Sequence, residues 1–220
     1  MSAEPLLLAL HSSSETLGVG LQALRTAAEG PDLAPPQLVS FPLGRRLSNE
    51  LLPCVEQLLP AARWPELARL VVATGPGGFT GTRLTVVLAR TLSQQLTIPL
   101  HGFSSFLLIA RRLAAAGAPM QAVPRFWITQ ELPRRGTVAG AYGPDAAALG
   151  GIAEFEPPRL YRSEFPWSGA DAEPACAALV DPEADTQQLL LLGQLAAAAG
   201  WAGPWAPVLP LYPTSPVEGL

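Results

Sequence analysis

Blocks of apolar and polar residues alternate along the first half of the chain and predict its order of strands and helices. An apolar run covers Pro5 to Leu10, a polar break HSSSE follows, and a second apolar run with small residues, TLGVGLQAL, comes next. This pattern predicts a β-hairpin at the start of the domain. A third strand is predicted at Gln37 to Leu43, after a loop rich in proline and glycine.

Helical spacing first occurs in the segment RRLSNELLPCVEQLLPAARW. Four apolar residues recur on one face: Leu47, Leu51, Val55 and Leu58. They predict a helix that starts near Ser48. Pro53 lies in the early part of this helix and removes a hydrogen bond there, so we expect a kink.

A second helix is predicted after the short β-branched strand Leu67 to Thr74. Its sequence, TRLTVVLARTLSQQL, is apolar nearly all round. One face can pack on a sheet, and the other apolar face needs a further cover. We expect Thr80 or Thr82 to cap this helix.

A further strand, TIPLHGF, and a helix, SSFLLIARRLAAAG, complete this half. We expect Ser104 or Ser105 to cap the helix and Gly117 to end it. The predicted order is three strands, then helix, strand, helix, strand and helix, which indicates an α/β domain.

The second half of the chain predicts strands at Val123 to Ile128 and at Thr137 to Tyr142, with proline-rich connections such as EFEPPRLY and SEFPWSG. Its clearest element is DTQQLLLLGQLAAAAG. This segment predicts a helix with Asp185 as N-cap, Gln188 at the capping-box position and Gly200 at its end. We expect the tail after it to be an ordered extended arm.

The composition fits a globular protein and limits its partners. Apolar residues make up 49 % of the chain, and the mean hydropathy of +0.26 is enough for a real core. The chain contains no apolar run of about 18 residues, the length that could span a bilayer. We therefore expect no membrane association and a cytoplasmic location. The net charge of −4 and the pI near 5.2 give no basic footprint, so any role with tRNA is expected to be indirect.

The residue types also exclude several kinds of site. The chain has no lysine, which rules out a Walker lysine and a Schiff base. It has two histidines, His11 and His101, and its two cysteines, Cys54 and Cys176, lie far apart without CxxC pairing. These counts indicate neither a histidine-rich metal site nor a disulfide framework, and we expect no cofactor.

A glycine-rich turn joins the strand to the second helix within VVATGPGGFTGTRLTVV. It contains Gly75, Pro76, Gly77, Gly78, Phe79 and Gly81. Backbone N–H groups of such a turn at a helix start can hold a phosphate. The spacing fits neither GxxxxGK[ST], because Thr82 follows Gly81, nor GxGxxG, because position 80 is threonine. In the other interpretation, the glycines only allow close backbone approach and a tight turn.

In this strand-to-helix context, GPGGFTGTR resembles the GPGSFTGxR signature of the TsaB (YeaZ) family. The opening LLLALHSSSETLGVGL resembles that family's LAIDTSxxxxSVAL, and LSNELLPCVEQLL resembles its HxxxLLPxIxxLL helix. Near the end, PLYPT stands where the family has a PxYLR-like sequence. The resemblance covers roughly residues 5 to 115, and this chain is interpreted as a divergent member.

The resemblance implies a two-lobed α/β fold of the actin/Hsp70/sugar-kinase type, which is ribonuclease H-like. The first lobe is expected at residues 1–104, and a smaller, degenerate second lobe at 105–220. TsaB proteins are non-catalytic partners of TsaD, which transfers a threonylcarbamoyl group to the adenosine beside the anticodon of tRNA. TsaE, an ATPase, completes the assembly. The implied partners are thus a TsaD-like transferase and a TsaE-like ATPase, with a homodimer as an alternative assembly.

In that family, the helices before and after the signature form the surface for a homodimer or for TsaD. By position, this surface falls on Ser48 to Leu59 and Thr80 to Leu92. The glycine-rich turn would then lead directly into a helix of the interface. The implied interface residues are Ser48, Leu51, Leu52, Val55, Leu59, Thr80, Arg83, Leu84, Val87 and Leu88.

Some positions depart from the family pattern. His11 replaces an aspartate of the first-strand motif, Thr129 and Glu131 replace the acid and the base of an IDAR-like strand, and YPT at 212–214 replaces YLR. Catalysis with a Mg²⁺-nucleotide needs carboxylates near the phosphates. Asp32, in a loop, is the only aspartate of the first lobe, so we expect no ATP turnover.

Two other functions stay open. The chain could be a degenerate sugar-kinase-like ATPase, or an interaction module for an unrelated partner that covers the apolar helix face. An enzyme that pairs His11 with Ser12 to Ser14 or with Ser104 is disfavoured. Neighbours in sequence do not form a triad, and no GxSxG motif is present.

Overall fold

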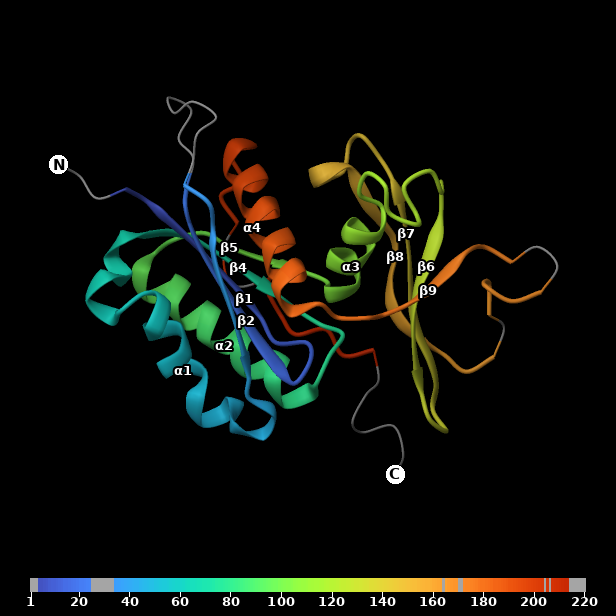
Figure 1. Ribbon diagram of the computed structural model, residues 1–220, viewed down its shortest axis with the longest axis horizontal. Coiled ribbons are helices and arrows are strands. Elements are labelled where there is room, and N and C mark those ends of the chain that lie inside the picture. The colour runs from blue at the N-terminus through green and yellow to red at the C-terminus, as the bar shows by residue number, and fades with distance from the viewer. Residues whose placement is uncertain are drawn as a thin grey trace.

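The computed structural model describes residues 4–24, 34–163, 165–169, 172–203, 205 and 207–213, and it contains two β-sheets with associated helices (Figure 1). The elements of the first half are β1 (Leu6–His11), β2 (Thr16–Ala23), β3 (Gln37–Pro42), α1 (Leu47–Leu58), β4 (Leu67–Ala73), α2 (Phe79–Leu96), β5 (Leu100–Phe103) and α3 (Ser105–Leu113). This is the order that the sequence pattern predicts. Asp32 and Thr214 lie outside the described residues.

The second half adds four strands and one long helix. They are β6 (Phe126–Leu132), β7 (Gly136–Pro144), β8 (Ile152–Tyr161), β9 (Ala175–Ala177) and α4 (Pro182–Ala198). Three short 3-10 helices, η1 (Gly44–Arg46), η2 (Ala61–Glu66) and η3 (Leu149–Gly151), lie in the connections.

The first sheet has the strand order β3-β2-β1-β4-β5. The hairpin of β1 and β2 and the pair of β2 and β3 are antiparallel, whereas β4 and β5 run parallel to β1. All six residues of β1 are buried. A strand at the centre of a sheet covered on both faces carries a continuous apolar run, which explains LLLAL without polar alternation.

Helices cover the two faces of this sheet differently (Figure 1). On one face α1 and α2 lie side by side and pack on leucines such as Leu8 and Leu10. On the other face α4 packs on β1, β2 and β4, with Leu189 and Leu192 against Leu7 and Val71. Alternate residues of each strand therefore face one helix layer or the other.

The second sheet has the order β8-β7-β6-β9, and α3 packs on its inner face. β8 contradicts the prediction that EFEPPRLY is a connection. Pro157 and Pro158 are accommodated because β8 is an edge strand and its register with β7 shifts between Ala139 and Ala141. Edge strands and bulges are the places where a sheet tolerates proline.

The helix ends correct two further predictions. α4 begins at Pro182, and its N-cap is Asp181, whose side chain accepts a hydrogen bond from the Ala184 N–H. Asp185, the predicted cap, is instead fully buried one turn into the helix. α3 ends at Leu113, before Gly117, while Ser104 caps its start as predicted.

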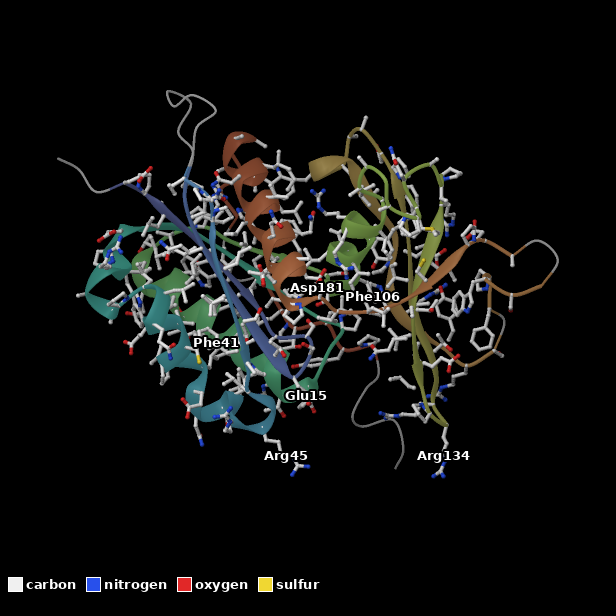
Figure 2. All side chains as sticks on the ribbon, in the orientation of Figure 1. Glu15, Phe41, Arg45, Phe106, Arg134 and Asp181 are labelled. Carbon is white, nitrogen blue, oxygen red and sulfur yellow. The ribbon has the colours of Figure 1, made fainter. Side chains whose placement is uncertain are left out.

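The chain enters the second sheet after α3 and returns to the first sheet through α4. Figure 2 shows Phe106 of α3 and Asp181 between the two sheets. The lobe boundary between residues 104 and 105 stays a prediction. In the described part of the chain, no helix is long and apolar enough to cross a membrane.

Candidate functional site

The glycine-rich turn packs closely against the β1–β2 turn. A Cβ on Gly77 would lie 2.5 Å from the Ser13 Cα and 2.6 Å from its carbonyl oxygen, so only glycine fits there. Gly75 has a φ of +99°, and its carbonyl accepts a hydrogen bond of 2.7 Å from the Ser105 N–H. The turn is thus held by its own chain on two sides, and Gly77 is required for close approach.

The start of α2 differs from its prediction. Its N-cap is Gly78, and no side chain caps the helix, so neither Thr80 nor Thr82 has that role. The Thr82 hydroxyl is buried without a hydrogen-bond partner in the structure, and Thr80 is exposed. The first N–H groups of α2 therefore lack a side-chain acceptor.

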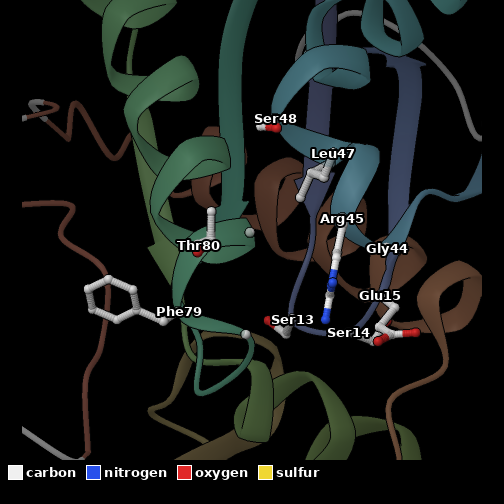
Figure 3. Close-up of a pocket in the computed structure, with 11 residues that line it drawn as sticks. Ser13, Ser14, Glu15, Gly44, Arg45, Leu47, Ser48, Phe79 and Thr80 are labelled. Atoms are coloured by element: carbon white, nitrogen blue, oxygen red, sulfur yellow. The ribbon is translucent and has the colours of Figure 1, made fainter. Parts of the chain in front are cut away.

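A cleft with a volume of about 540 Å³ lies beside this helix start (Figure 3). Its walls come from the β1–β2 turn, η1, the start of α1 and the segment at the start of α2. Figure 3 shows Arg45 extending toward Ser14 and Glu15, whereas Phe79 points away from the cleft. The lining residues are Ser13, Ser14, Glu15, Gly44, Arg45, Leu47, Ser48, Gly78, Phe79, Thr80 and Gly81.

Serines at the end of β1 connect elements that are distant in sequence. Ser12 Oγ lies 2.7 Å from Thr85 Oγ1 of α2, and Ser13 Oγ hydrogen-bonds Ser105 Oγ at the start of α3. The adjacent Ser104 Oγ lies 3.4 Å from the Tyr142 hydroxyl of β7. In the sequence these serines indicate only a polar break in a hairpin, because their partners lie far along the chain.

His11 ends β1 and is fully buried, with neither ring nitrogen hydrogen-bonded. Burial disfavours the charged imidazolium and lowers the pKa of His11 to about 4. The end of β1 therefore carries a neutral ring where a carboxylate would be needed to hold a cation. Among the described residues, no group of three His, Cys, Asp or Glu side chains gathers as a metal site.

Polar contacts also join α3 to α4 at the junction of the two sheets. Arg112 Nε donates to Asp185 Oδ1 at 3.1 Å, and Asp185 also accepts from the Asp181 N–H at 2.9 Å. Arg111 donates to Gln188 of α4 and to the Gly150 carbonyl. Burial raises the pKa of Asp185 to about 6, although Arg112 acts in the opposite direction.

The predicted interface residues divide into an exposed and a buried set. The exposed or half-buried members are Ser48, Leu52, Thr80, Arg83, Leu84, Val87 and Leu88. Leu52 is 41 % exposed and Val87 51 % exposed, which is high for apolar residues in the middle of helices. Leu51, Val55 and Leu59 point inward and belong to the chain's own core.

The outer sides of α1 and α2 thus form one surface, which we call the α1/α2 face. It is defined by Leu52 of α1 with Leu84, Val87 and Leu88 of α2. Thr85, Val86 and Ala89 lie on the opposite, buried side of α2. The sequence predicts the excess of apolar residues on α2. In the structure Val87 is exposed, whereas Leu84 and Leu88 are half-buried and pack partly against the core.

The chain is similar over part of its length to proteins with a known name. It is 35 % identical to the tRNA threonylcarbamoyladenosine biosynthesis protein TsaB of Bacillus subtilis over 106 residues, which are 47 % of this chain and 43 % of that protein. It is 32 % identical to TsaB of Buchnera aphidicola over 65 residues, 29 % of this chain and 31 % of the relative. The matched segments thus span less than half the length of these curated relatives.

Two further matches concern a family and a fold. The family model of TsaD, tRNA N6-adenosine threonylcarbamoyltransferase, matches residues 42–124. The structure of YeaZ from Pseudomonas aeruginosa superposes with a TM-score of 0.67 at 22 % identity, over 94 % of this chain and 99 % of that one.

The fold and the site define the class of the protein as a two-lobed α/β protein of the ribonuclease H-like type. In this protein the glycine-rich turn packs against the β1–β2 turn. Both curated matches are to proteins named TsaB, the family that the quoted motifs resemble. Members of this family are named for the biosynthesis of threonylcarbamoyladenosine in tRNA.

Proposed function

We propose that this chain is a non-catalytic scaffold subunit that binds a TsaD-like transferase through the α1/α2 face. It would support transfer of a threonylcarbamoyl group to the adenosine beside the anticodon of tRNA, in the cytoplasm, together with a TsaE-like ATPase. The observation that carries the proposal is the uncovered apolar side of two adjacent helices, with Leu52 and Val87 about half exposed. A specific interface needs such an apolar centre with a polar rim.

The match to the TsaD family model supports this choice of partner. It covers residues 42–124, which include α1 and α2. A TsaD-like protein would therefore carry a related pair of helices. Related helical surfaces can pair about a two-fold or pseudo-two-fold axis, as the surfaces of a homodimer do.

The residues at the end of β1 support a non-catalytic role. His11 is neutral and enclosed, Ser12 and Ser13 are hydrogen-bonded to α2 and α3, and Gly77 lies against the Ser13 backbone. A sugar-kinase-like ATPase needs carboxylate oxygens at this place to hold a Mg²⁺-nucleotide. Calorimetric titration with Mg²⁺-ATP tests that alternative, and micromolar binding by the chain alone would favour it.

The decisive experiment is reconstituted threonylcarbamoylation with TsaD, TsaE, ATP, threonylcarbamoyl-adenylate and tRNA, with and without this chain. We expect product only when the chain is added. Val87→Arg and Leu84→Arg should remove both TsaD binding and product, because each places a charge in the centre of the interface. Leu191→Arg is the matched control, because Leu191 is 44 % exposed on α4, on the other side of the sheet.

Two results would contradict the proposal. Product formation that is independent of the chain would remove the scaffold role. TsaD binding that survives both α2 variants would move the interface elsewhere. In either case, an interaction module for an unrelated partner becomes the leading function.

A further inference from the structure

The tail after α4 follows β5 and returns to the glycine-rich turn. The Gly203 carbonyl accepts a hydrogen bond of 3.2 Å from the Leu100 N–H at the start of β5. Further on, the Leu211 N–H donates to the Thr74 carbonyl at 2.7 Å, directly before the turn. The tail is therefore anchored at the start of β5 and again directly after the end of β4.

Side chains fix the tail between these anchors. Val208 is buried in the core, and a Cβ on Gly102 of β5 would lie 2.8 Å from its Cγ1. Near the end, the Leu211 carbonyl oxygen lies 3.2 Å from the Cβ position of Gly75. Close packing of this kind gives the described part of the tail a defined path.

Tyr212 is brought in this way onto the first residue of α2. Its ring centroid lies 4.9 Å from that of Phe79, and the planes are tilted by 36°. Both rings remain accessible, with Tyr212 40 % and Phe79 49 % exposed. An aromatic pair with this much exposed surface leaves apolar area for a further contact.

This aromatic pair is continuous with the α1/α2 face. Phe79, Arg83 and Val87 follow one another at intervals of four residues, and all three are exposed. Residues at this spacing share one side of a helix. The pair therefore lies at the N-terminal end of the stripe that contains Val87, and Phe79 also borders the cleft.

We infer that the tail supplies Tyr212 to the partner-binding surface, so that the TsaD-like partner contacts both α2 and the C-terminal tail. This inference rests on the proposed function, because it extends the same surface. Because the exposed stripe on α2 is continuous, we expect one partner to cover both the aromatic pair and the α1/α2 face. Tyr and Phe rings in preformed positions bind with little loss of side-chain entropy, and aromatic residues are the ones enriched at energetically important contacts.

The test is the affinity of recombinant TsaD for a set of full-length variants, measured by calorimetry together with each variant's melting temperature. We expect Tyr212→Ala to weaken binding about tenfold and Tyr212→Phe to bind within about twofold of the original, because the ring makes the contact. Phe79→Ala should also weaken binding, and the double variant should lose less than the sum of the two.

Trp201→Ala is the matched control in the tail. Trp201 is 45 % exposed and packs edge-on to His101, and it belongs to the tail segment beside the start of β5. Its removal should lower the melting temperature without changing the affinity for TsaD. An equal loss of affinity in Trp201→Ala and Tyr212→Ala would overturn the inference, because the tail would then act only through stability.

The remaining outcomes separate this inference from the proposed function. If the unchanged chain does not bind TsaD, the proposed function fails and the inference with it. If Val87→Arg removes binding while Tyr212→Ala leaves the affinity unchanged, the proposed function stands and the inference is wrong. If Tyr212→Ala weakens only self-association, the tail serves a second copy of the chain, which also contradicts the inference.

Discussion

The two faces of the first sheet are both covered by helices, but the two covers differ in their outer sides. α4 lies between the sheet and the rest of the molecule, and its polar groups bond to α3 through Arg112, Asp185 and Gln188. Among the described residues, no such polar contact joins the outer side of α1 and α2 to another helix layer, and this side exposes Leu52 and Val87. α4 also exposes Leu191 and Leu195, but α4 is joined to α3 by polar contacts, so we expect the apolar area of α1 and α2 to be the part left for a partner. Substitutions on the α4 side should therefore affect stability, and those on the α1/α2 face should affect association.

The largest expected effect is that of Gly18→Ala on the α4 side. A Cβ at Gly18 would lie 2.2 Å from Thr186 Oγ1 and 2.7 Å from the Pro182 carbonyl, so α4 would have to move. We expect a loss of about 3 kcal/mol in the free energy of unfolding, measured by urea denaturation. Gly78→Ala, at a position with open space around it, should cost under about 1 kcal/mol. Equal losses would show that α4 is not closely packed on β2.

The next effect is expected from Arg112→Leu. Asp185 has no exposed side-chain surface, so its carboxylate would lose its partner cation inside the junction. We expect a loss of about 2 kcal/mol at neutral pH and a further rise in the pKa of Asp185. Arg63→Leu breaks the exposed pair with Glu66 and should cause no measurable loss. Unchanged stability of Arg112→Leu would mean that the ion pair does not hold the junction.

His11 should make the stability of the protein depend on pH. The folded pKa is about 4, below the ordinary value of 6.5, so the unfolded chain binds more protons between these values. Stability should thus fall as the pH decreases from 6.5 toward 4. Asp185, whose pKa is raised from 3.8 to about 6, acts in the opposite direction from pH 6 downward.

The variant His11→Leu isolates the contribution of the histidine. We expect it to keep about 2 kcal/mol more of its stability than the original protein between pH 7 and 5. Denaturation curves at both pH values provide the measurement. Parallel pH profiles for the two proteins would show that His11 is protonated in the folded state or accessible to water.

The smallest expected effect on stability is that of Val87→Arg. With half of its surface already exposed, the side chain can be replaced by a charged one with a change within about 0.5 kcal/mol. The same variant should nevertheless lose the TsaD-like partner. A large loss of stability would show that Val87 supports the fold, and the contrast between the two faces would then disappear.

The order of elements in the first half could be predicted because its signals are local. The apolar run of β1, the spacing of leucines in α1 and the serine cap of α3 each depend on neighbouring residues. The sequence does not predict β8 because prolines usually end a strand, and its edge position with a shifted register depends on the whole sheet. The predicted start of α4 at Asp185 is wrong because Asp181 followed by Pro182 is the start signal of this helix.

The site could be predicted only in part. The motif located the glycine-rich turn and the two helices, but helical spacing alone did not distinguish buried Val55 from exposed Leu52. That distinction depends on where the sheet lies. The contacts of Ser12 and Ser13 join residues 73 and 92 positions apart, and the contact of Tyr212 with Phe79 joins the tail to α2. Such pairs follow from the fold and leave no local pattern in the sequence.

The return of α4 to the first sheet has a consequence for synthesis on the ribosome. All five strands of that sheet precede residue 104, whereas the helix that covers Leu7, Ala9 and Val71 begins only at Pro182. The nascent chain must therefore expose this apolar face while the whole second sheet is translated. Chaperones that bind apolar segments would find their site there, and a pause in translation before α4 would prolong the period in which the chain can aggregate.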